Sequence, residues 1–337
     1  MYTETIVFDC PPASTDPSGS VLKMVAKWYS VGESTSNEAG FTLLFAHCVG
    51  AHKEQWEPTI EELIRLQRHK APRERVREAW SFDWPSHGDA AVLNRAFIAR
   101  NRDTGIAASE WAKAIAAFVR SRLQGKRLVV MGHSAACSAV MLSIKDIAVA
   151  DIPYAAIVLI EPTFGTREEF NRHIAPSLPK AIEVISALRA QWPSRAAAHA
   201  WLQRLPQWKS WDARVLRIYT EYGLADTPDG KVEVKCDRRQ EALAYADPTP
   251  HFAAVEELAR VSHAIPIHLV YASRSHAVPR PVQDALPNAA ANRVFASFTR
   301  LEGGHLLVQE DPDRVALMIS TVLDSVGAQE LLPNHKL

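Results

Sequence analysis

One serine lies in a sequence context that would expose a reactive hydroxyl. Ser134 follows the apolar run at residues 128–131 and stands between the small residues Gly132 and Ala135. A helical pattern starts directly after it, so the chain must turn sharply from a strand into a helix at the serine. Small neighbours permit such a turn, because larger side chains would clash with the strand and the helix. The first amides of the helix could stabilise an oxyanion, although an incidental serine at a structural turn is the alternative.

A histidine late in the chain could accept the proton of this serine. His305 follows Gly303 and Gly304 in a loop after a weakly predicted strand. An imidazole suits general-base catalysis because it changes charge within the physiological pH range. A single histidine more often has a structural role, but its place after the serine favours the general base.

The carboxylate that orients the histidine is predicted at the end of another strand. Glu161 follows six apolar residues and precedes Pro162. A carboxylate at this position could hold the imidazole of His305 in one tautomer and balance its positive charge. Burial of a carboxylate is costly without a hydrogen-bonding or charged partner. A glutamate at the rim that faces solvent is the alternative, and Asp284 and Glu302 are less suitable acids.

Alternating strands and helices would position these side chains. Uniformly apolar runs rich in β-branched residues predict buried strands, and helical periodicity follows several of them. This alternation is typical of a mostly parallel central sheet with helices on both faces. The predicted strands are residues 41–46, 76–82, 127–131, 155–160, 265–272 and 293–301, and the predicted helices are residues 54–68, 111–123, 136–147 and 312–323.

One segment interrupts the alternation and predicts a cap. Residues 162–263 contain little strand signal and are dominated by helical, arginine-rich and tryptophan-rich sequence. We expect a helical cap inserted after the sixth strand, with residues 1–161 and 264–337 forming the core. Its tryptophans could cover an apolar acyl group, or they could only pack the cap onto the core.

Composition argues against several other classes of protein. The 337 residues include 38 Lys+Arg and 38 Asp+Glu, so the net charge gives no reason to expect nucleic acid or an anionic membrane as a partner. Four cysteines without a CxxC pair argue against a zinc site and a disulfide framework. His47 and His52 lack a third ligand at a suitable spacing, so we expect no metal. The sequence has no secretory signal pattern and no apolar run of about 20 residues, so we expect no stable membrane insertion.

Two motifs resemble those of the α/β-hydrolase superfamily, and they imply its fold. The sequence GHSAA around Ser134 resembles the nucleophile elbow G-x-S-x-G, with Ala136 in place of the last glycine. The sequence EGGH, which ends at His305, resembles the loop that carries the general base. Where the superfamily most often has an aspartate, in Y-G-x-x-D, this chain has Ser275. The IEP sequence at Glu161 resembles the members whose acid follows the preceding strand.

The resemblance also implies an oxyanion hole and a substrate pocket. The strand at residues 41–46 leads into a His-Gly type of loop, in which Cys48 replaces the usual glycine. By this match, the backbone N–H groups of Val49 and Ala135 would stabilise the oxyanion. The side chains that we expect in the substrate pocket are those of His47, Cys48, His133, Trp192 and Trp208.

The whole chain resembles a fungal group of α/β-hydrolases. The segments AHCVGAHKEQWEP, LIEPT and VEVKCDRRQEALAY suggest this group, which includes peroxisomal lipase-like proteins and toxin-biosynthesis or acyl-CoA hydrolases of secondary metabolism. It implies that Ser134, His305 and Glu161 cleave an ester or acyl-CoA thioester of an apolar acyl substrate through an acyl-enzyme, without a cofactor. An acyltransferase, a cyclising or C–C-cleaving enzyme, and a non-catalytic ligand receptor on the same scaffold are the alternatives.

Two further segments concern location and partners. The C-terminal residues His335-Lys336-Leu337 loosely resemble the peroxisomal address Ser-Lys-Leu, which would be bound by an import receptor. We therefore expect a peroxisomal or a cytoplasmic location, and a tail of arbitrary sequence is the alternative. The basic run at residues 65–77 could bind the phosphates of coenzyme A, but such a run is more often a solvated helix end.

Overall fold

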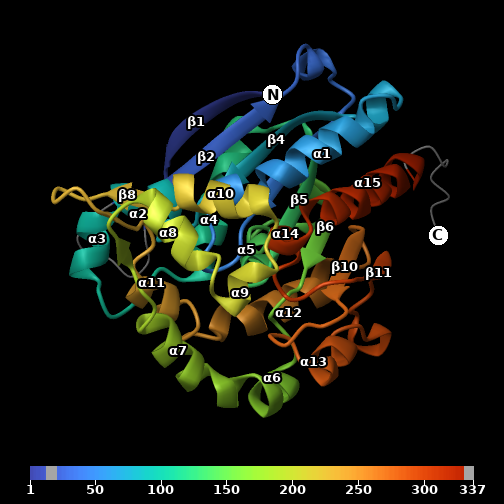
Figure 1. Cartoon of the computed structure of the whole chain (residues 1–337). Coiled ribbons are helices and arrows are strands. Elements are labelled where there is room, and N and C mark those ends of the chain that lie inside the picture. Colours follow the sequence, from blue (N-terminus) through green and yellow to red (C-terminus); the bar gives the residue numbers. More distant parts are fainter. Residues whose placement is uncertain (13–20, 330–337) are drawn as a thin grey trace.

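A mixed eight-stranded sheet forms the centre of the computed structural model, which describes residues 1–12 and 21–329 (Figure 1). The strand order is β1-β2-β4-β3-β5-β6-β10-β11. β2 pairs antiparallel with β1 and β4, whereas all other neighbouring strands are parallel, so the predicted mostly parallel sheet is confirmed. The strands are β1 (Tyr2–Asp9), β2 (Lys23–Ser30), β3 (Phe41–Ala46), β4 (Val76–Phe82), β5 (Arg127–His133), β6 (Tyr154–Ile160), β10 (Ile267–Ala272) and β11 (Ser297–Leu301).

Helices cover both faces of the sheet because the central strands are apolar on both sides. In β5, Val130 belongs to one buried cluster and Val129 to the other, since successive side chains point to opposite faces. The Val129 cluster includes side chains of α1 (Glu57–Gln67) and α15 (Pro312–Gln329). The Val130 cluster includes side chains of α4 (Ala108–Arg122), α5 (Ala136–Leu142) and α12 (Thr249–Val261).

The sequence-based prediction located the central strands well and missed the first two. β3 and β4 have the predicted bounds, and β5 continues two residues further, to His133. β1 and β2 form an antiparallel edge. β1 is exposed along most of its length and contains several polar residues, so it lacks the apolar run that identified the buried strands.

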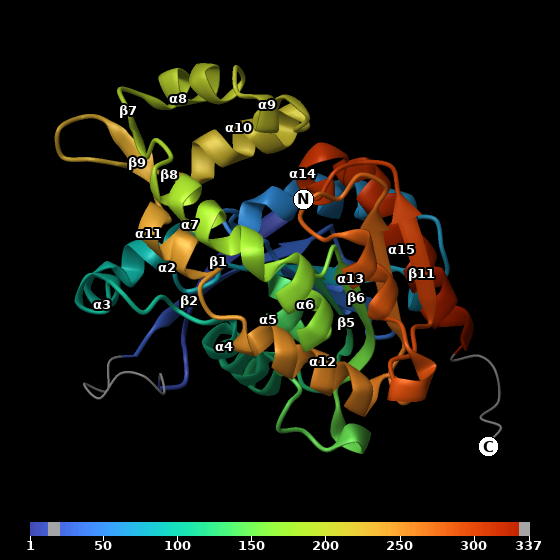
Figure 2. The same cartoon turned by 90° about the horizontal axis from the view of Figure 1, so that it is seen from below.

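The segment after β6 is only partly helical, which corrects the predicted helical cap. It contains a small sheet of three short strands in the order β7-β9-β8. Figure 2 shows these strands with α8, α9 and α10 on one side of the molecule, away from the main sheet. The elements are α6 (Arg167–His173), α7 (Leu178–Ser186), β7 (Gln191–Trp192), α8 (Arg195–Leu202), α9 (Pro206–Lys209), α10 (Ala213–Tyr222), β8 (Leu224–Asp226), β9 (Val232–Val234) and α11 (Arg238–Leu243).

The last helix of the segment predicted as the cap, α12, contacts both the core and the cap. Its Phe252, Leu258 and Val261 lie in the same buried cluster as side chains of α5 and the sheet. Phe252 also packs on Phe170 of α6, at a ring-centroid distance of 5.2 Å. The shorter helices that complete the core are α2 (Gly88–Leu93), α3 (Arg95–Arg100), α13 (Arg280–Ala285) and α14 (Leu307–Glu310).

A buried lysine holds the loop after β3 in place. Lys53 is completely buried, and its Nζ lies 3.0 Å from Oδ2 of Asp83 and 2.8 Å from Oε1 of Glu54. Asp89 of α2 accepts a further bond from Nζ at 2.6 Å and also contacts Lys235, which follows β9 in the cap. Burial alone would lower the pKa of Lys53, but these carboxylates outweigh it and raise the pKa. The network joins the loop, α2 and the cap.

Loss of this cation should destabilise the protein strongly. We expect Lys53→Met to lower the free energy of unfolding by about 3–5 kcal/mol, because it leaves buried carboxylates without their partner. Chemical denaturation measures the change. Lys180→Met removes a solvent-exposed ion pair with Glu183 and is the control, with an expected loss below about 1 kcal/mol. Equal losses in the two variants would show that the buried network contributes no more than a surface pair.

A buried histidine in the sheet makes stability depend on pH. His268 of β10 is buried, and its Nδ1 lies 2.8 Å from Oγ of Ser297 on β11. Burial lowers the pKa of His268 to about 4. Below pH 6.5 the unfolded chain therefore takes up a proton that the folded chain does not, so acid favours unfolding.

His268→Gln should remove this part of the pH dependence. Between pH 7 and pH 5, we expect the wild type to lose about 2 kcal/mol more of its free energy of unfolding than the variant loses. Glutamine can keep a hydrogen bond to Ser297 but does not titrate. Urea denaturation at the two pH values measures the difference, and parallel losses in both proteins would contradict the assignment.

Candidate active site

Ser134 stands on the sharp turn that its small neighbours predicted. It follows β5 directly and precedes α5, and its φ of 60° lies in the left-handed region that non-glycine residues rarely adopt. Its N–H donates to the carbonyl of Ile160 at 2.9 Å, which fixes the turn against the end of β6. A Cβ at Gly132 would lie 2.9 Å from the Cα of Cys137, so only glycine fits there.

The hydroxyl, the imidazole and the carboxylate form one hydrogen-bonded chain. Nε2 of His305 lies 2.9 Å from Oγ of Ser134, and Nδ1 lies 2.7 Å from Oε2 of Glu161. Glu161 is completely buried, and the His305 side chain is 19% exposed. These are the distances that a nucleophile, its base and the group that orients the base require. The structure thus brings together three residues that lie far apart in the sequence, with 171 positions between Ser134 and His305.

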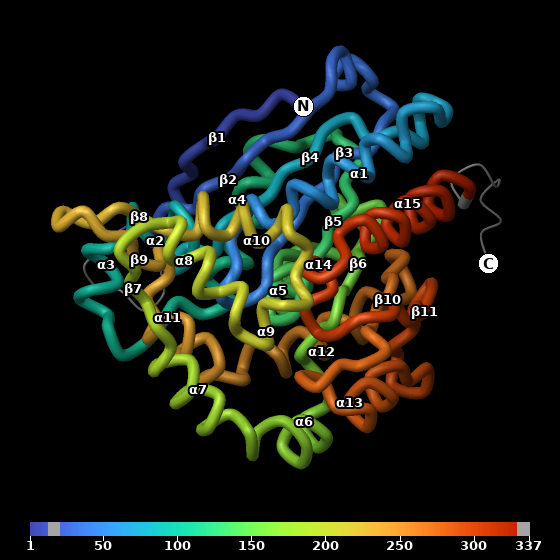
Figure 3. Tube along the Cα trace, viewed as in Figure 1, coloured from blue at the N-terminus to red at the C-terminus, as the bar shows by residue number. Residues whose placement is uncertain are grey.

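Glu161 is held by groups at the end of β10 and just after it. The backbone N–H of Ala272 donates to Oε1 at 2.6 Å, and Oγ of Ser275 donates to Oε2 at 2.5 Å. Glu161 also has a positive φ, of 52°, and its own N–H donates to the carbonyl of Val270 at 2.7 Å. Figure 3 shows the traces of β5, β6 and β10 side by side, so the ends of neighbouring parallel strands supply the site.

The loop that carries His305 is fixed from two sides. The N–H of Gly304 donates to Oε2 of Glu310 in α14 at 2.7 Å. Nε2 of His133, the residue before the nucleophile, lies 2.9 Å from the carbonyl oxygen of His305 and donates to it. Burial lowers the pKa of His133 to about 3, so its ring stays neutral near pH 7. His133 therefore links the nucleophile turn to the histidine loop.

The loop proposed for the oxyanion hole lies beside the nucleophile turn. Val49 is half-buried and packs against the same apolar cluster that contains Ala135. Nδ1–H of His47 donates to the carbonyl of Cys48 at 2.8 Å, and Nε2 accepts from the N–H of Trp84 at 3.1 Å. Burial lowers the pKa of His47 to about 3 and raises that of Cys48 to about 12. Both side chains are neutral and buried at neutral pH.

The substrate contacts expected of His47, Cys48 and His133 gain no support from this geometry. His47 has both ring nitrogens engaged, Cys48 is buried and accepts from Gln309, and His133 bonds to the histidine loop. A position next to Ser134 or the oxyanion loop does not reveal which way a side chain points.

The two tryptophans expected in the pocket pack inside the cap. Trp192 is 1% exposed and belongs to a cluster with Val232 and Trp201. The ring of Trp208 packs at a tilt against those of Trp211 and Tyr219, at centroid distances of 4.3 Å and 4.8 Å. The alternative in which these tryptophans only stabilise the cap therefore describes them better.

A narrow crevice that the sequence analysis missed reaches the nucleophile turn. It has a volume of about 40 Å³ and extends from the exposed Asp247 and Thr104 to Ala135. Its further walls include Trp84, Ile106, Leu243, Pro250 and His251. Leu243 belongs to the cap segment that carries the family resemblance, but no residue pattern indicated that it would line the same crevice as Ala135.

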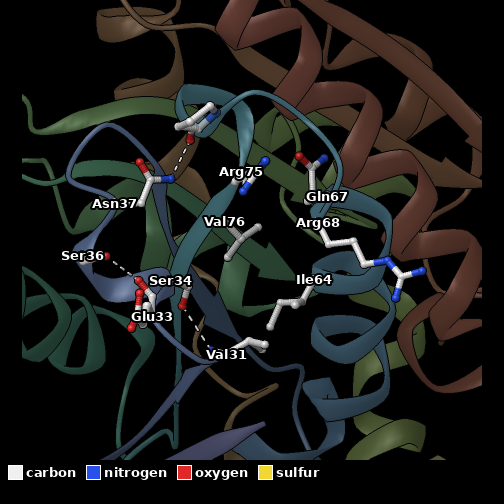
Figure 4. A pocket seen from close by; sticks show the side chains of 11 residues that line it. Val31, Glu33, Ser34, Ser36, Asn37, Ile64, Gln67, Arg68, Arg75 and Val76 are labelled. Carbon is white, nitrogen blue, oxygen red and sulfur yellow. Dashed lines mark hydrogen bonds between the residues drawn. The ribbon is translucent and has the colours of Figure 1, made fainter.

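A larger groove of about 530 Å³ lies near the start of the parallel strand β4, at the opposite end of the strands from Ser134 (Figure 4). It is bordered by the start of β4 at Val76 and by Gln67, Arg68 and Arg75, whereas Ser134 follows the far end of the parallel strands. The basic run at residues 65–77 therefore lies away from Ser134, and its geometry gives no support for binding the phosphates of an acyl-CoA near Ser134.

Residues 1–12 and 21–329 contain no group of three histidine, cysteine, aspartate or glutamate side chains arranged to hold a metal ion. None of their helices combines the length and the apolar character needed to cross a bilayer. All four cysteines are buried and free of disulfides.

Comparisons with known proteins agree with this architecture. The model of the "Alpha/beta hydrolase family" matches residues 43–316, while no curated protein sequence matches the chain. Peroxisomal alpha-beta-hydrolase Lpx1 from Saccharomyces cerevisiae is similar in structure, with a TM-score of 0.77 at 18% identity over 100% of this chain and 92% of that one. The thioesterase domain from the curacin biosynthetic pathway has a TM-score of 0.64 at 14% identity, over 95% and 99% of the two chains. An esterase of Mycobacterium tuberculosis has a TM-score of 0.63 at 17% identity, over 96% and 92%. This chain belongs to the alpha/beta hydrolase family.

Proposed function

We propose that the protein is a serine hydrolase that cleaves an ester or thioester of an apolar acyl substrate. The observation that carries this proposal is the placement of the His305 imidazole, with one nitrogen 2.9 Å from Ser134 and the other 2.7 Å from Glu161. Esterases and a thioesterase domain are among the proteins of similar structure, which supports both kinds of acyl substrate.

The reaction would proceed through a covalent acyl-enzyme. Oγ of Ser134 attacks the carbonyl carbon while Nε2 of His305 accepts the hydroxyl proton. The proton then passes to the leaving alcohol or thiol as its bond to the acyl carbon breaks. A water molecule, deprotonated by the same nitrogen, attacks the acyl-enzyme and releases the acid and the free serine. The carboxylate of Glu161 stabilises the imidazolium during both steps.

Two backbone amides would stabilise the oxyanion of each tetrahedral intermediate. Ala46, at the end of β3, pairs with Gly132 of β5, so the loop that carries Val49 and the turn that carries Ala135 start from neighbouring strand ends. Amide donors suit this role because they are held by the fold before the charge develops. The buried network around Lys53, four residues after Val49, keeps the first of these loops in position.

The crevice at Ala135 is the route by which we infer that the substrate reaches the serine. Trp84, Ile106 and Leu243 give it apolar walls, and the carboxylate of Asp247 lies at its exposed end. Its volume of about 40 Å³ favours a short acyl or alcohol group unless the cap moves. A series of p-nitrophenyl esters and acyl-CoAs of increasing chain length measures this preference.

A peroxisomal location is part of the proposal. It is supported by the C-terminal His335-Lys336-Leu337, which lies outside the described residues, and by the structural similarity to peroxisomal Lpx1. Binding by an import receptor and a place in fungal secondary metabolism remain predictions of the sequence resemblance.

Removal of the nucleophile should abolish turnover without disturbing the fold. We expect Ser134→Ala to lower kcat for a p-nitrophenyl ester by about 10⁴-fold or more, because no acyl-enzyme can form. Substrate affinity, measured by equilibrium binding of the unreacted ester, should change little.

Ser143→Ala is the matched control for this variant. Ser143 is also buried and follows α5, but its hydroxyl bonds to Tyr154 and to the carbonyl of Val140, and it should leave kcat within about 2-fold. Turnover retained by Ser134→Ala would refute the assignment of the nucleophile. Transfer of the acyl group to an added alcohol in preference to water would instead identify an acyltransferase.

A further inference from the structure

Ser275, in the loop after β10, contacts the catalytic carboxylate. Its Oγ donates to Oε2 of Glu161 at 2.5 Å, and the same oxygen lies 2.7 Å from Nδ1 of His305. A single carboxylate oxygen thus separates the serine hydroxyl from the imidazole. We propose that Ser275 is a positioning residue that holds the Glu161 carboxylate in the orientation that His305 requires. This inference rests on the proposed function, because it concerns how the same triad is held.

A second contact directs the hydroxyl of Ser275 towards the carboxylate. The backbone N–H of Val278 donates to Oγ of Ser275 at 3.3 Å, so this oxygen already acts as an acceptor and its proton points elsewhere. Ser275 is half-buried, whereas Glu161 is completely buried. The protein thus supplies a preplaced donor at a position where an ordered water would otherwise have to be immobilised.

Rotation of the carboxylate is the motion that Ser275 restrains. The N–H of Ala272 fixes Oε1 at 2.6 Å, and Oε2 accepts from Ser275 in addition to the imidazole that it orients. The bond from Ser275 fixes Oε2, so both oxygens are held and Oε2 stays directed at Nδ1 of His305. Both donors belong to the short segment at the end of β10, so this segment holds both oxygens of the Glu161 carboxylate.

The place of Ser275 in the chain explains why a neutral donor is suitable. This is the position at which the superfamily most often has its aspartate. Because Glu161 already occupies this site, an aspartate at 275 would bring two carboxylates together, where they cannot both ionise readily. A hydroxyl keeps the contact with the acid and adds no charge.

A double-mutant cycle on kcat tests the assignment. We expect Ser275→Ala to lower kcat about 10-fold and to change KM by less than about 2-fold, because the residue acts through Glu161 and not on the substrate. Ser275→Thr keeps the hydroxyl and should restore most of the loss. In the Glu161→Gln background, where the carboxylate is absent, Ser275→Ala should change kcat by less than about 2-fold, since coupled residues are not additive.

Two outcomes of the cycle would overturn the assignment. One is an unchanged kcat for Ser275→Ala, and the other is an equal loss in the two backgrounds, which would show a general effect on the loop. The melting temperature of each variant identifies a loss of folded protein. If Ser275→Ala does not fold, the comparison is made with Ser275→Cys, which replaces the hydroxyl by a weak donor and should also lower kcat.

The low-field proton resonance of His305 Nδ1–H gives a readout that does not need turnover. We expect Ser275→Ala to shift or broaden this resonance, and His276→Ala, a change at the exposed neighbouring residue, to leave it unchanged. An unchanged resonance in Ser275→Ala would overturn the assignment. If the wild type cleaves no ester or thioester, the proposed function fails, while this resonance still tests whether Ser275 positions Glu161.

Discussion

The structure of the site depends on one buried carboxylate. Glu161 is completely removed from solvent, which would be costly if its oxygens lacked donors. Ala272, at the end of β10, and Ser275, just after it, supply two of them, and the imidazole of His305 supplies the third. Because the carboxylate and its donors lie at the ends of three different strands, β6, β10 and β11, the site can form only when the parallel sheet has its native order. The proposed catalytic geometry therefore depends on the correct fold of the whole sheet.

The cap contributes to this geometry through the loops at the mouth of the sheet. Lys235 bonds to Asp89, which shares the buried lysine of the loop after β3. Glu241 of α11 lies directly over Gly50, where an added Cβ would be 2.7 Å from its carboxylate oxygen. The N–H of Asp212 donates to the carbonyl of Gln309 in α14, behind the histidine loop. Movement of the cap would thus reach both the proposed oxyanion loop and the base.

The sequence predicted those parts of the molecule that are determined by residues close together in the chain. The apolar runs that became β3, β4, β5 and β6 are buried on both faces, and the nucleophile turn shows its small residues directly. Glu161 was recognisable because a charge at the end of an apolar run needs a partner. The side-chain directions of His47, Cys48 and Trp192 depend on contacts between distant segments, and no local pattern encodes them. The same reason explains why the donor role of Ser275, the crevice at Ala135 and the packing of α12 on the core were missed.

Labelling with a fluorophosphonate tests most directly whether His305 activates Ser134. The reagent phosphonylates a serine whose hydroxyl is made nucleophilic by a neighbouring base, and it does not require that the natural substrate be known. Intact-mass measurement and peptide mapping should show one phosphonyl group, attached to Ser134, and His305→Gln should slow the reaction by at least about 100-fold. Absence of labelling, labelling at another residue, or an equal rate in His305→Gln would contradict the account.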